Sequence, residues 1–530
     1  MTKEGFFDRK LYLDILEKRI NALKDGYRQN IAIVGDESVG KTSIIFKFLN
    51  KFYDTRTIIV YLEIRPESTD SFVKRFVGVL LYNFLSNSGI ILKEDIDFLI
   101  KNARKFAPKT AEKVRTILNA TAKRKQICAF QELLSLCDII NQETGKFCVV
   151  IFDEFHNLEN LGFKNMYREW SKLLIQQKNT LYIIISSMKF KTKAILSKHL
   201  SLLFGNFEVL TIEPFDIRVS ERYLEQRLQL PHQNIPLKNF LVHFTGGYPI
   251  YLELITDMFK NKGEDNLASI LENLLFDTSG ILNQRFSNYL KRFLDTPHSN
   301  DYISILHLIA NGKNKIKDIA HLLRKPKKDL ALRINHLLEL GAITRSADFL
   351  KINDRVFGFW LKFVYQEKQH SLTFDDQNQN AFFKGRIDNM IQEFFSNAQK
   401  PVLERALELL RLFEDEMVQI ERKKIRLNHF REIKPLEFNN RGLKCGLIGR
   451  SQGSVWIMAF KQGQLSEDDI TSFAKECKKY RHKLQRNIIV SLQEIDSNTK
   501  LKAMEEKIWT WDINNFNQIM DLYSKPWVIA

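Results

Sequence analysis

The segment at residues 35–42 has the residue types and the spacing of a phosphate-binding loop. It consists of Gly-Asp-Glu-Ser-Val-Gly-Lys-Thr and fits the pattern GxxxxGK[ST] without a mismatch. In such a loop the glycines let backbone N–H groups curve around phosphates, the lysine reaches the β and γ oxygens, and the threonine hydroxyl ligates Mg²⁺. We therefore expect a nucleoside triphosphate and Mg²⁺ to bind here. The expected binding residues are Gly35, Asp36, Glu37, Ser38, Val39, Gly40, Lys41, Thr42 and Ser43.

Two acidic residues, Asp153 and Glu154, follow an apolar run at residues 147–152. In open α/β sheets ligands bind at the carboxyl ends of the strands, which is where this pair would lie. We expect Asp153 to hold Mg²⁺ through water, with Thr42 as the direct ligand. We expect Glu154 to polarise the attacking water, because hydrolysis needs a base in line with the γ-phosphate.

The elements that must position these groups are short apolar runs separated by helical patterns. The expected strands are residues 31–34, 57–64, 147–152, 181–186 and 207–212. A helix with apolar Ile44, Ile45 and Phe48 follows the phosphate loop, and its N-terminus adds partial positive charge beside the phosphates. Strands alternating with helices predict an α/β fold built on a parallel sheet.

These residues resemble the archaeal-type ATPase family, a branch of the signal-transducing P-loop ATPases with numerous domains. The resemblance extends from Phe7 to about Tyr365 and then, more faintly, to the C-terminus. It is carried by FFDRKLYLDIL with Asp8 and Arg9, the phosphate loop, DEFH, ISS, LTIEPF and TGGYPIYLELI. It implies an ASCE/AAA-like P-loop core, a helical lid that opens at Pro214, and ATP as the nucleotide.

The resemblance also assigns roles near the γ-phosphate. Ser186 stands where related ATPases keep a polar residue that senses this phosphate, and we count it with Lys41 and Glu154 as catalytic. The alternative is that Ser186 and Ser187 simply end a strand. The family often has Gly-Arg before the fifth strand, whereas this chain has Gly205-Asn206. An arginine finger is therefore absent there, and we expect slow turnover.

Residues 301–352 have the pattern of a winged helix. Three amphipathic helices, at 302–310, 316–323 and 327–341, precede two short strands around residues 346–348. In DNA-binding versions the third helix enters the major groove. The expected contacts to duplex DNA are Lys327, Lys328, Arg333 and Arg345, with Arg324, Lys325 and Lys351 beside them. The alternative is a protein-docking or autoinhibitory block with a solvated charged face.

The C-terminal segment resembles the restriction-endonuclease-like domain that is often fused to these ATPases. A working nuclease needs carboxylates to hold its metal ion. The matching strand has Ala459-Phe460-Lys461, so the lysine is present and the glutamate is missing, and Glu404 is left without a second acid. We expect this domain to be inactive as a nuclease; the alternative is an unrelated α/β domain.

Composition limits the remaining possibilities. The formal net charge is +17, and the 80 Lys and Arg residues favour a polyanionic partner, although a generally lysine-rich composition would give the same count. The five cysteines form no CxxC motif, which favours a reducing compartment. No run approaches the ~18 apolar residues of a membrane helix. We expect a cytoplasmic protein with no membrane association.

The sequence thus predicts four domains and one leading function. The predicted boundaries are 1–213 for the ATPase core, 214–295 for the lid, 296–365 for the winged helix and 381–530 for the nuclease-like domain, with a polar linker at 366–380. The leading hypothesis is an ATP-dependent switch that changes the grip of the winged helix on DNA or on a protein partner. The alternatives are a DNA-binding regulator with a vestigial ATPase site and a nuclease effector. The oligomeric state, including a homo-oligomer, stays open.

Overall fold

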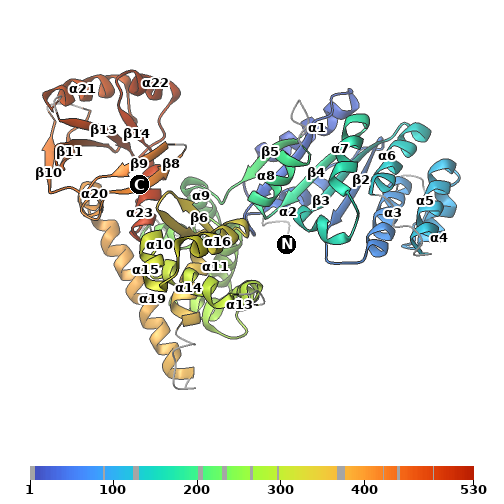
Figure 1. Ribbon diagram of the computed structural model, residues 1–530, viewed down its shortest axis with the longest axis horizontal. Coiled ribbons are helices and arrows are strands. Elements are labelled where there is room, and N and C mark those ends of the chain that lie inside the picture. The colour runs from blue at the N-terminus through green and yellow to red at the C-terminus, as the bar shows by residue number, and fades with distance from the viewer. Residues whose placement is uncertain are drawn as a thin grey trace. The chain divides into compact units, whose positions relative to one another are not determined.

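The structure is a computed structural model in which the chain divides into two compact units. The described residues are 6–86, 90–122, 130–200, 207–228, 235–262, 267–294, 298–366, 376–421, 423–438, 442–480 and 483–529. Unit 1 comprises residues 1–215, 248–250 and 339–341, and unit 2 comprises 216–247, 251–338 and 342–530. Figure 1 traces both units in chain order. Among the described residues no helix is long and apolar enough to cross a membrane.

Unit 1 is built on a five-stranded parallel sheet in the order β2-β3-β4-β1-β5. The strands are β1 (Asn30–Gly35), β2 (Thr57–Glu63), β3 (Phe147–Asp153), β4 (Thr180–Ser186) and β5 (Phe207–Ile212). The five predicted strands are therefore confirmed within one residue at each end. Strands β1, β4 and β3 are parallel neighbours, with β4 in the middle. The phosphate loop, Ser186 and the Asp153-Glu154 pair therefore all lie at the carboxyl ends of adjacent strands.

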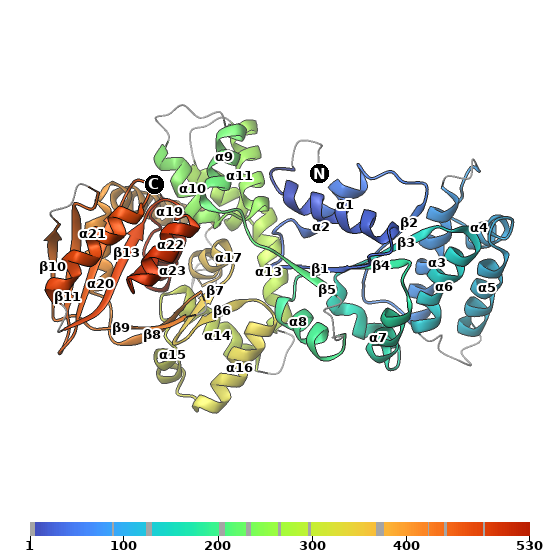
Figure 2. The same ribbon diagram turned by 90° about the horizontal axis from the view of Figure 1, so that it is seen from above.

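Helices cover both faces of this sheet. They are α1 (Lys10–Lys24), α2 (Lys41–Leu49), α3 (Thr69–Leu85), α4 (Ile96–Ala103), α5 (Pro108–Ala122), α6 (Phe130–Thr144), η1 (Phe155–Leu161), α7 (Met166–Gln176) and α8 (Lys189–Lys198). One core cluster joins alternate residues of the strands to α3, α5, α6, α7 and α8, and Trp170 is fully buried in it. Helix α1 lies on the other face (Figure 2). This is the expected α/β arrangement of a P-loop core.

The first part of unit 2 is helical and contains the predicted three helices and hairpin. The leading helices are α9 (Ile217–Leu228), α10 (Ile235–Thr245), α11 (Pro249–Lys262), α12 (Leu267–Leu271), η3 (Glu272–Phe276) and α13 (Ile281–Leu294). Then follow α14 (Ser299–Ala310), α15 (Ile316–Leu323), α16 (Lys327–Glu339), β6 (Ile343–Ser346), β7 (Phe349–Ile352), α17 (Arg355–Trp360) and η4 (Leu361–Tyr365). Leu330, Ile334 and Leu337 are the buried stripe of α16, as its periodicity predicts.

The C-terminal part of unit 2 is an α/β domain with a mixed sheet in the order β10-β11-β12-β13-β14. Its elements are α19 (Asp376–Gln399), α20 (Val402–Leu410), β8 (Glu416–Ile420), β9 (Lys423–Leu427), β10 (Glu432–Glu437), β11 (Cys445–Arg450), β12 (Val455–Lys461), α21 (Glu467–Cys477), η5 (Lys478–Tyr480), β13 (Leu484–Ser491), α22 (Ser497–Glu505), β14 (Trp509–Trp511) and α23 (Ile513–Leu522). Helix α19 begins inside the predicted linker, most of which lies outside the described residues. Two core clusters cover opposite faces of the sheet, one with β8, β9, α20 and α23 and the other with α21 and α22.

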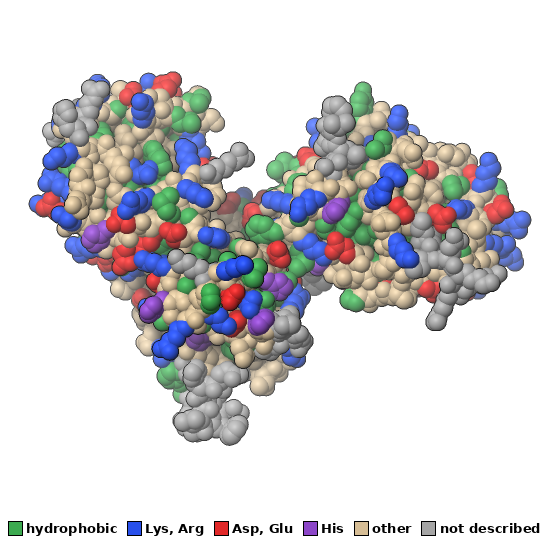
Figure 3. Space-filling model, in the orientation of Figure 1, with side chains coloured by type: hydrophobic (Ala, Val, Ile, Leu, Met, Phe, Trp, Pro, Cys, Tyr) green, Lys and Arg blue, Asp and Glu red, His purple; other side chains and the backbone are tan. Residues whose placement is uncertain are grey.

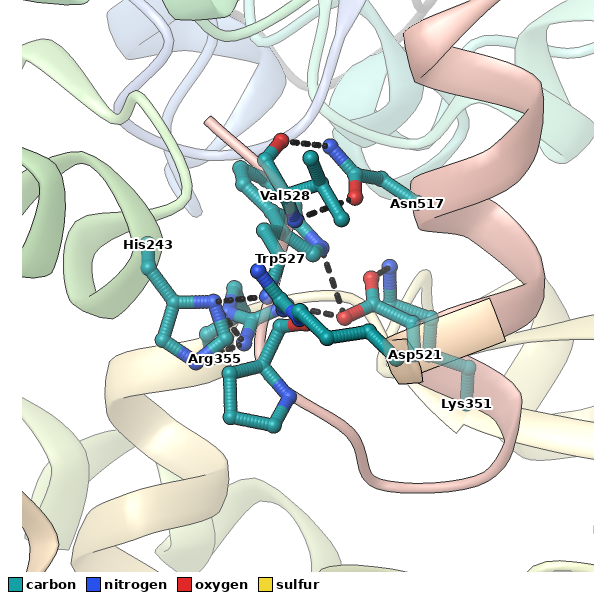
Figure 4. Close-up of polar contacts among 9 residues, drawn as sticks. His243, Lys351, Arg355, Asn517, Asp521, Trp527 and Val528 are labelled. Atoms are coloured by element: carbon teal, nitrogen blue, oxygen red, sulfur yellow. Dashed lines mark hydrogen bonds and ion pairs between the residues drawn. The ribbon is translucent and has the colours of Figure 1, made fainter. Parts of the chain in front are cut away.

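A buried polar cluster joins these two parts of unit 2 (Figure 4). Asp521 of α23 accepts hydrogen bonds from Lys351 of β7 at 2.5 Å and from the indole Nε1 of Trp527 at 2.8 Å, and it pairs with Arg355 of α17. The Arg355 guanidinium also bonds His243 of α10 and stacks over the Trp527 ring. The C-terminal residues and hairpin β6–β7 are therefore held against α10 by one charged centre. We call these five residues the Asp521 cluster.

Candidate functional site

The predicted phosphate loop connects β1 to α2 with two residues in left-handed conformations. The φ angles are 66° at Ser38 and 95° at Gly40, and α2 begins at Lys41. Gly35 is required where β1 ends, because a Cβ there would lie 2.4 Å from the carbonyl oxygen of Ile212 on β5. The unpaired N–H groups and the dipole of the α2 N-terminus favour an anion at this place.

The Lys41 side chain lies inside the loop. It is 5% exposed, and its ammonium donates to the carbonyl oxygens of Gly35 at 3.0 Å and Asp36 at 2.7 Å. Burial lowers the pKa of Lys41, while the nearby carboxylates of Glu154 and Asp153 oppose that shift. A buried ammonium held by neutral carbonyl groups can exchange them for phosphate oxygens.

Thr42 and Asp153, which are 111 positions apart in the sequence, are in contact. The Thr42 hydroxyl donates to Asp153 Oδ2 at 2.8 Å, and Tyr61 of β2 donates to the same oxygen at 2.9 Å. The other oxygen accepts the backbone N–H of Glu154 at 2.8 Å. Mg²⁺ prefers oxygen ligands, so an adjacent hydroxyl and carboxylate fit that ion.

Glu154 lies beside this pair with a left-handed φ of 50°. Its carboxylate accepts a hydrogen bond from Ser187 at 3.0 Å and lies 3.3 Å from the His156 ring. Burial and the neighbouring Asp153 charge raise the pKa of Glu154, and Lys41 opposes them. A carboxylate whose pKa is raised accepts a proton more readily, as the predicted general base requires.

Ser186 ends β4 between the two motifs. It is fully buried, and its hydroxyl lies 3.2 Å from His156 Nδ1 and accepts the Met188 N–H at 3.1 Å. The structure therefore brings Ser186 into the same group as Glu154, through His156. The sequence analysis included His156 in the DEFH motif but predicted no role for it. It predicted no contacts for Tyr61 and Ser187.

Lys189, at the start of α8, is a site residue that the sequence analysis missed. Its ammonium lies 3.2 Å from Asp36 Oδ2 and 3.3 Å from Glu213 Oε1. The hydroxyl of Tyr248, in the Gly-Gly-Tyr-Pro segment, lies 3.5 Å from the same Asp36 oxygen. Arg9 donates to the Glu213 carbonyl at 2.6 Å and stacks over Phe215. The phosphate loop is thus tied to the end of β5, while the Gly205-Asn206 position lies outside the described residues.

The candidate DNA-contacting residues differ in their exposure to solvent and in whether they form internal ion pairs. Lys328 is exposed, and Arg345 is exposed with its Nε donating to the Ala347 carbonyl at 2.9 Å. Arg333 is paired with Asp301 at 3.4 Å, as is Lys325 at 2.9 Å, and Lys351 belongs to the Asp521 cluster. The side chain of Lys327 lies outside the described residues. On the surface shown in Figure 3, Lys and Arg side chains are widely spread.

The residues that the sequence analysis compared with a nuclease motif lie on β12 (Val455–Lys461). Ala459 is fully buried, and Lys461 pairs with Asp469 at 2.8 Å and donates to the Gly442 carbonyl at 3.0 Å. Within the described part of the chain, no three His, Cys, Asp or Glu residues are grouped so as to hold a metal ion. Lys461 is therefore engaged in an internal ion pair.

Comparisons with known proteins address the P-loop part of the chain. Residues 6–255 match the family described as an ATPase domain predominantly from Archaea. No curated protein matches the sequence. Among solved structures, the Walker-type ATPase of Pyrococcus abyssi is similar, at 19% identity and a TM-score of 0.51, over 68% of this chain and 97% of that one. The ORC2 protein of Aeropyrum pernix, in ADPNP and ADP complexes, matches at 12% identity and a TM-score of 0.39, over 70% of this chain and 98% of that one.

The likeness to the Pyrococcus abyssi structure indicates the fold. The family match covers the five strands of unit 1, the phosphate loop, Asp153 and Glu154. The family expected from the sequence is confirmed for this part of the chain. Residues 6–255 form an ATPase domain of this predominantly archaeal family.

Proposed function

We propose that the protein hydrolyses ATP at the carboxyl ends of the central strands of the unit 1 sheet. The observation that carries this proposal is the 2.8 Å contact between Thr42 of the phosphate loop and Asp153 of the acid strand. That contact brings together the two halves of a triphosphatase site from β1 and β3. Thr42 and Asp153 would hold Mg²⁺, which when bound neutralises charge on the β and γ oxygens.

The chain's own residues supply the remaining steps. Lys41 leaves the carbonyl oxygens of Gly35 and Asp36 and donates to the phosphates instead. Glu154 orients the attacking water and accepts its proton, for which its raised pKa is suited. Ser187 contacts Glu154 directly and Ser186 contacts it through His156, so that Ser186 would sense the γ-phosphate.

We further propose that the nucleotide state changes the binding of duplex DNA by the winged helix. Support comes from the exposed cations on and beside α16: Arg324, Lys328 and Arg345 are exposed and have no acidic partner within the described residues. Because Arg333 and Lys351 are engaged in internal ion pairs, they contribute to DNA binding less than the sequence analysis expected. A switch requires that ATP and ADP stabilise different arrangements, since a ligand that binds both equally shifts nothing.

The test is hydrolysis combined with DNA affinity. Lys41→Ala is expected to abolish ATP hydrolysis, measured as phosphate release with and without duplex DNA. DNA affinity, measured by fluorescence anisotropy, is expected to differ between ATP, ADP and no nucleotide. Equal affinities in the three states would end the coupling proposal. Hydrolysis surviving in Lys41→Ala would end the site assignment.

A protein partner is the second candidate for the winged helix, because two apolar side chains there are exposed. Leu322 of α15 is 50% exposed and Leu332 of α16 is 58% exposed. Leu332→Ser would weaken binding to a protein and leave phosphate contacts unchanged. DNA affinity that is insensitive to both Lys328→Ala and Leu332→Ser, together with binding to a protein that Leu332→Ser abolishes, would favour this candidate.

We also propose that the C-terminal domain has no nuclease activity. The support is the ion pair of Lys461 with Asp469 and the buried Ala459. DNA cleavage that requires a divalent metal and is lost in Lys461→Ala would contradict this proposal.

A further inference from the structure

The wing of the winged helix, hairpin β6–β7, is joined to the backbone of β8 in the C-terminal domain by hydrogen bonds of its own backbone and side chains. The N–H of Asp348 donates to the Met417 carbonyl at 3.2 Å, and the N–H of Met417 donates to Asp348 Oδ2 at 2.8 Å. The N–H of Gln419 donates to the Ser346 hydroxyl at 2.9 Å. Strand β8 therefore lies along β6, and hairpin β8–β9 lies next to the wing.

The other side of the wing is buried. Phe349 is fully buried within the apolar core of the C-terminal domain and packs edge-on against Tyr523 at 5.3 Å. Lys351 is bound to Asp521, and Lys315, just before α15, is bound to Glu414 at 2.8 Å. The wing is thus fixed in place, and of its own cations only Arg345 stays exposed.

The outer face of the neighbouring hairpin β8–β9 carries further cations. Lys424 lies opposite Gln419, and Arg426 lies opposite Met417. Because Ile425 and Leu427 are buried, their neighbours Lys424 and Arg426 point to solvent. Lys424 has no acidic partner within the described residues.

Two carboxylates, those of Asp415 and Asp348, lie near these cations. The ion pair of Arg426 with Asp415, at 3.4 Å, has side chains 61% and 48% exposed, and such exposed pairs are weak. The Asp348 carboxylate already accepts the Met417 N–H. The face therefore keeps Lys424 as a cation with no acidic partner within the described residues.

The cationic surface continues across β9 to the edge of the sheet. Lys423 lies over the Trp509 ring at 5.4 Å, and the Arg486 guanidinium lies over the same ring at 4.3 Å. Arg486 is half-buried, and its Nε is buried without a hydrogen-bond partner within the described residues. Cations and an aromatic ring arranged in this way suit a negatively charged backbone and suit an apolar partner poorly.

We propose that hairpin β8–β9 extends the wing and contacts the phosphate backbone of the duplex DNA that α16 engages. We call Arg345, Lys424 and Arg426 the extended wing. The proposal rests on the proposed DNA function and adds contacts from about 80 positions further along the chain. It also gives the C-terminal domain a role that needs no nuclease chemistry.

The experiment compares the salt dependence of DNA affinity in the full chain and in Lys424→Ala/Arg426→Ala. Each phosphate contact contributes about 0.9 to the slope of log affinity against log salt. The double variant is expected to lower that slope by about 2 and to weaken binding at low salt by roughly tenfold or more. The charge-conserving Lys424→Arg/Arg426→Lys variant is expected to keep the wild-type slope.

The matched control is Lys475→Ala/Lys500→Ala, which removes the same total charge. Lys475 on α21 and Lys500 on α22 are exposed, and both helices pack on the opposite face of the mixed sheet from β8 and β9. This control is expected to change the slope by less than half as much. Tryptophan fluorescence of each variant verifies that the fold is retained.

The outcomes separate the two proposals. If the wild-type chain binds no duplex DNA, the proposed DNA function is wrong and the extended wing has no ligand. If the wild-type chain binds DNA and the Lys424→Ala/Arg426→Ala variant has the same slope and affinity, the extended wing is overturned while the DNA function stands. Equal losses in the test and control variants would also overturn it, because total charge would then explain the result.

Discussion

Two carboxylates with little exposed surface, Asp153 in unit 1 and Asp521 in unit 2, are compensated in different ways. Asp521 is paired with two cations, Lys351 and Arg355, and accepts an indole N–H (Figure 4). Asp153 accepts only neutral donors, from Thr42, Tyr61 and the backbone of Glu154. Within the described residues, then, one carboxylate is neutralised and the other is not.

The surrounding groups show the same difference. Burial opposes ionisation of Asp521, yet Arg355 and Lys351 hold the pKa of its carboxyl well below the usual range. Burial and the Arg355 charge lower the pKa of His243, so that its ring stays neutral. Near Asp153 the pKa of Glu154 is raised, and the ammonium of Lys41 is bonded to carbonyl oxygens.

The comparison teaches how a structural charge cluster differs from a site that awaits ligands. The Asp521 cluster is complete without any other molecule, because each charge has an opposite partner from the chain. The Asp153 group holds two carboxylates and one ammonium, so a divalent cation would give the carboxylates a counter-charge and a phosphate would give Lys41 an anionic partner. A buried charge that the chain leaves uncompensated thus indicates function.

The largest expected effect comes from Glu154→Gln in the uncompensated group. The amide keeps the shape and can still meet Ser187, but it cannot accept a proton from water. We expect the single-turnover rate of ATP hydrolysis to fall about 10²–10⁴-fold, with nucleotide affinity within about threefold of the wild type. A rate within threefold of the wild type would show that another group is the base.

We expect a substitution in the Asp521 cluster to lower the free energy of unfolding and to leave ATP binding and hydrolysis unchanged. Asp521→Asn leaves the partly buried Arg355 and Lys351 without their counter-charge, and the cost is at most the value of about 3–5 kcal/mol for breaking a fully buried pair. Denaturant unfolding followed by tryptophan fluorescence measures this change, since five of the six tryptophans belong to unit 2.

The matched control for Asp521→Asn is Glu505→Gln. Glu505 pairs with Lys502 at 3.1 Å in the same unit, but its side chain is 69% exposed. We expect this substitution to cost less than about 1 kcal/mol. A loss of ATP affinity in Asp521→Asn, with unfolding unchanged, would contradict the division between a structural and a functional cluster.

Lys189 lies between the two cases, because it pairs with Asp36 of the phosphate loop and with Glu213 after β5. Lys189→Ala would leave both carboxylates beside the phosphate site without their cation. Since a hydrogen bond to a charged group is worth about 1.5–3 kcal/mol, we expect ATP affinity to fall roughly tenfold. Lys189→Arg should restore affinity to within about threefold, and the exposed Lys193→Ala serves as the control. Equal affinities in Lys189→Ala and Lys193→Ala would assign Lys189 a surface role only.

The parts of the site that the sequence predicted lie in short consecutive motifs. Residues 35–42 define their own loop, and an apolar run followed by Asp153 and Glu154 defines a strand end. The periodicity of apolar residues also predicted α15 and β5 with the bounds that the structure has. In each case the physical information is local, because strand alternation and loop chemistry act over a few residues.

The parts that the sequence did not predict depend on tertiary contacts. Lys189 reaches Asp36 across 153 positions, and its helix α8 begins with alternating lysines that indicate only a solvated face. Hairpin β8–β9 was missed because half of its side chains are charged, although Val418, Ile420, Ile425 and Leu427 alternate along it. Arg333 was assigned to DNA because nothing local indicates its pairing with Asp301.

The smallest expected effect is the pH dependence of the Asp521 cluster. Because the folded pKa of Asp521 is depressed, its contribution to stability is fully present above the unfolded value of about 3.9 and is lost as the pH falls toward the folded value. The difference in unfolding free energy between the wild type and Asp521→Asn should therefore be constant from pH 7 to pH 5. Below about pH 4 it should shrink by roughly 1.4 kcal/mol per pH unit, the limit for one proton. A difference that stays constant down to pH 3 would mean that Asp521 is not held ionised by Arg355 and Lys351, and that the two carboxylates do not differ as argued.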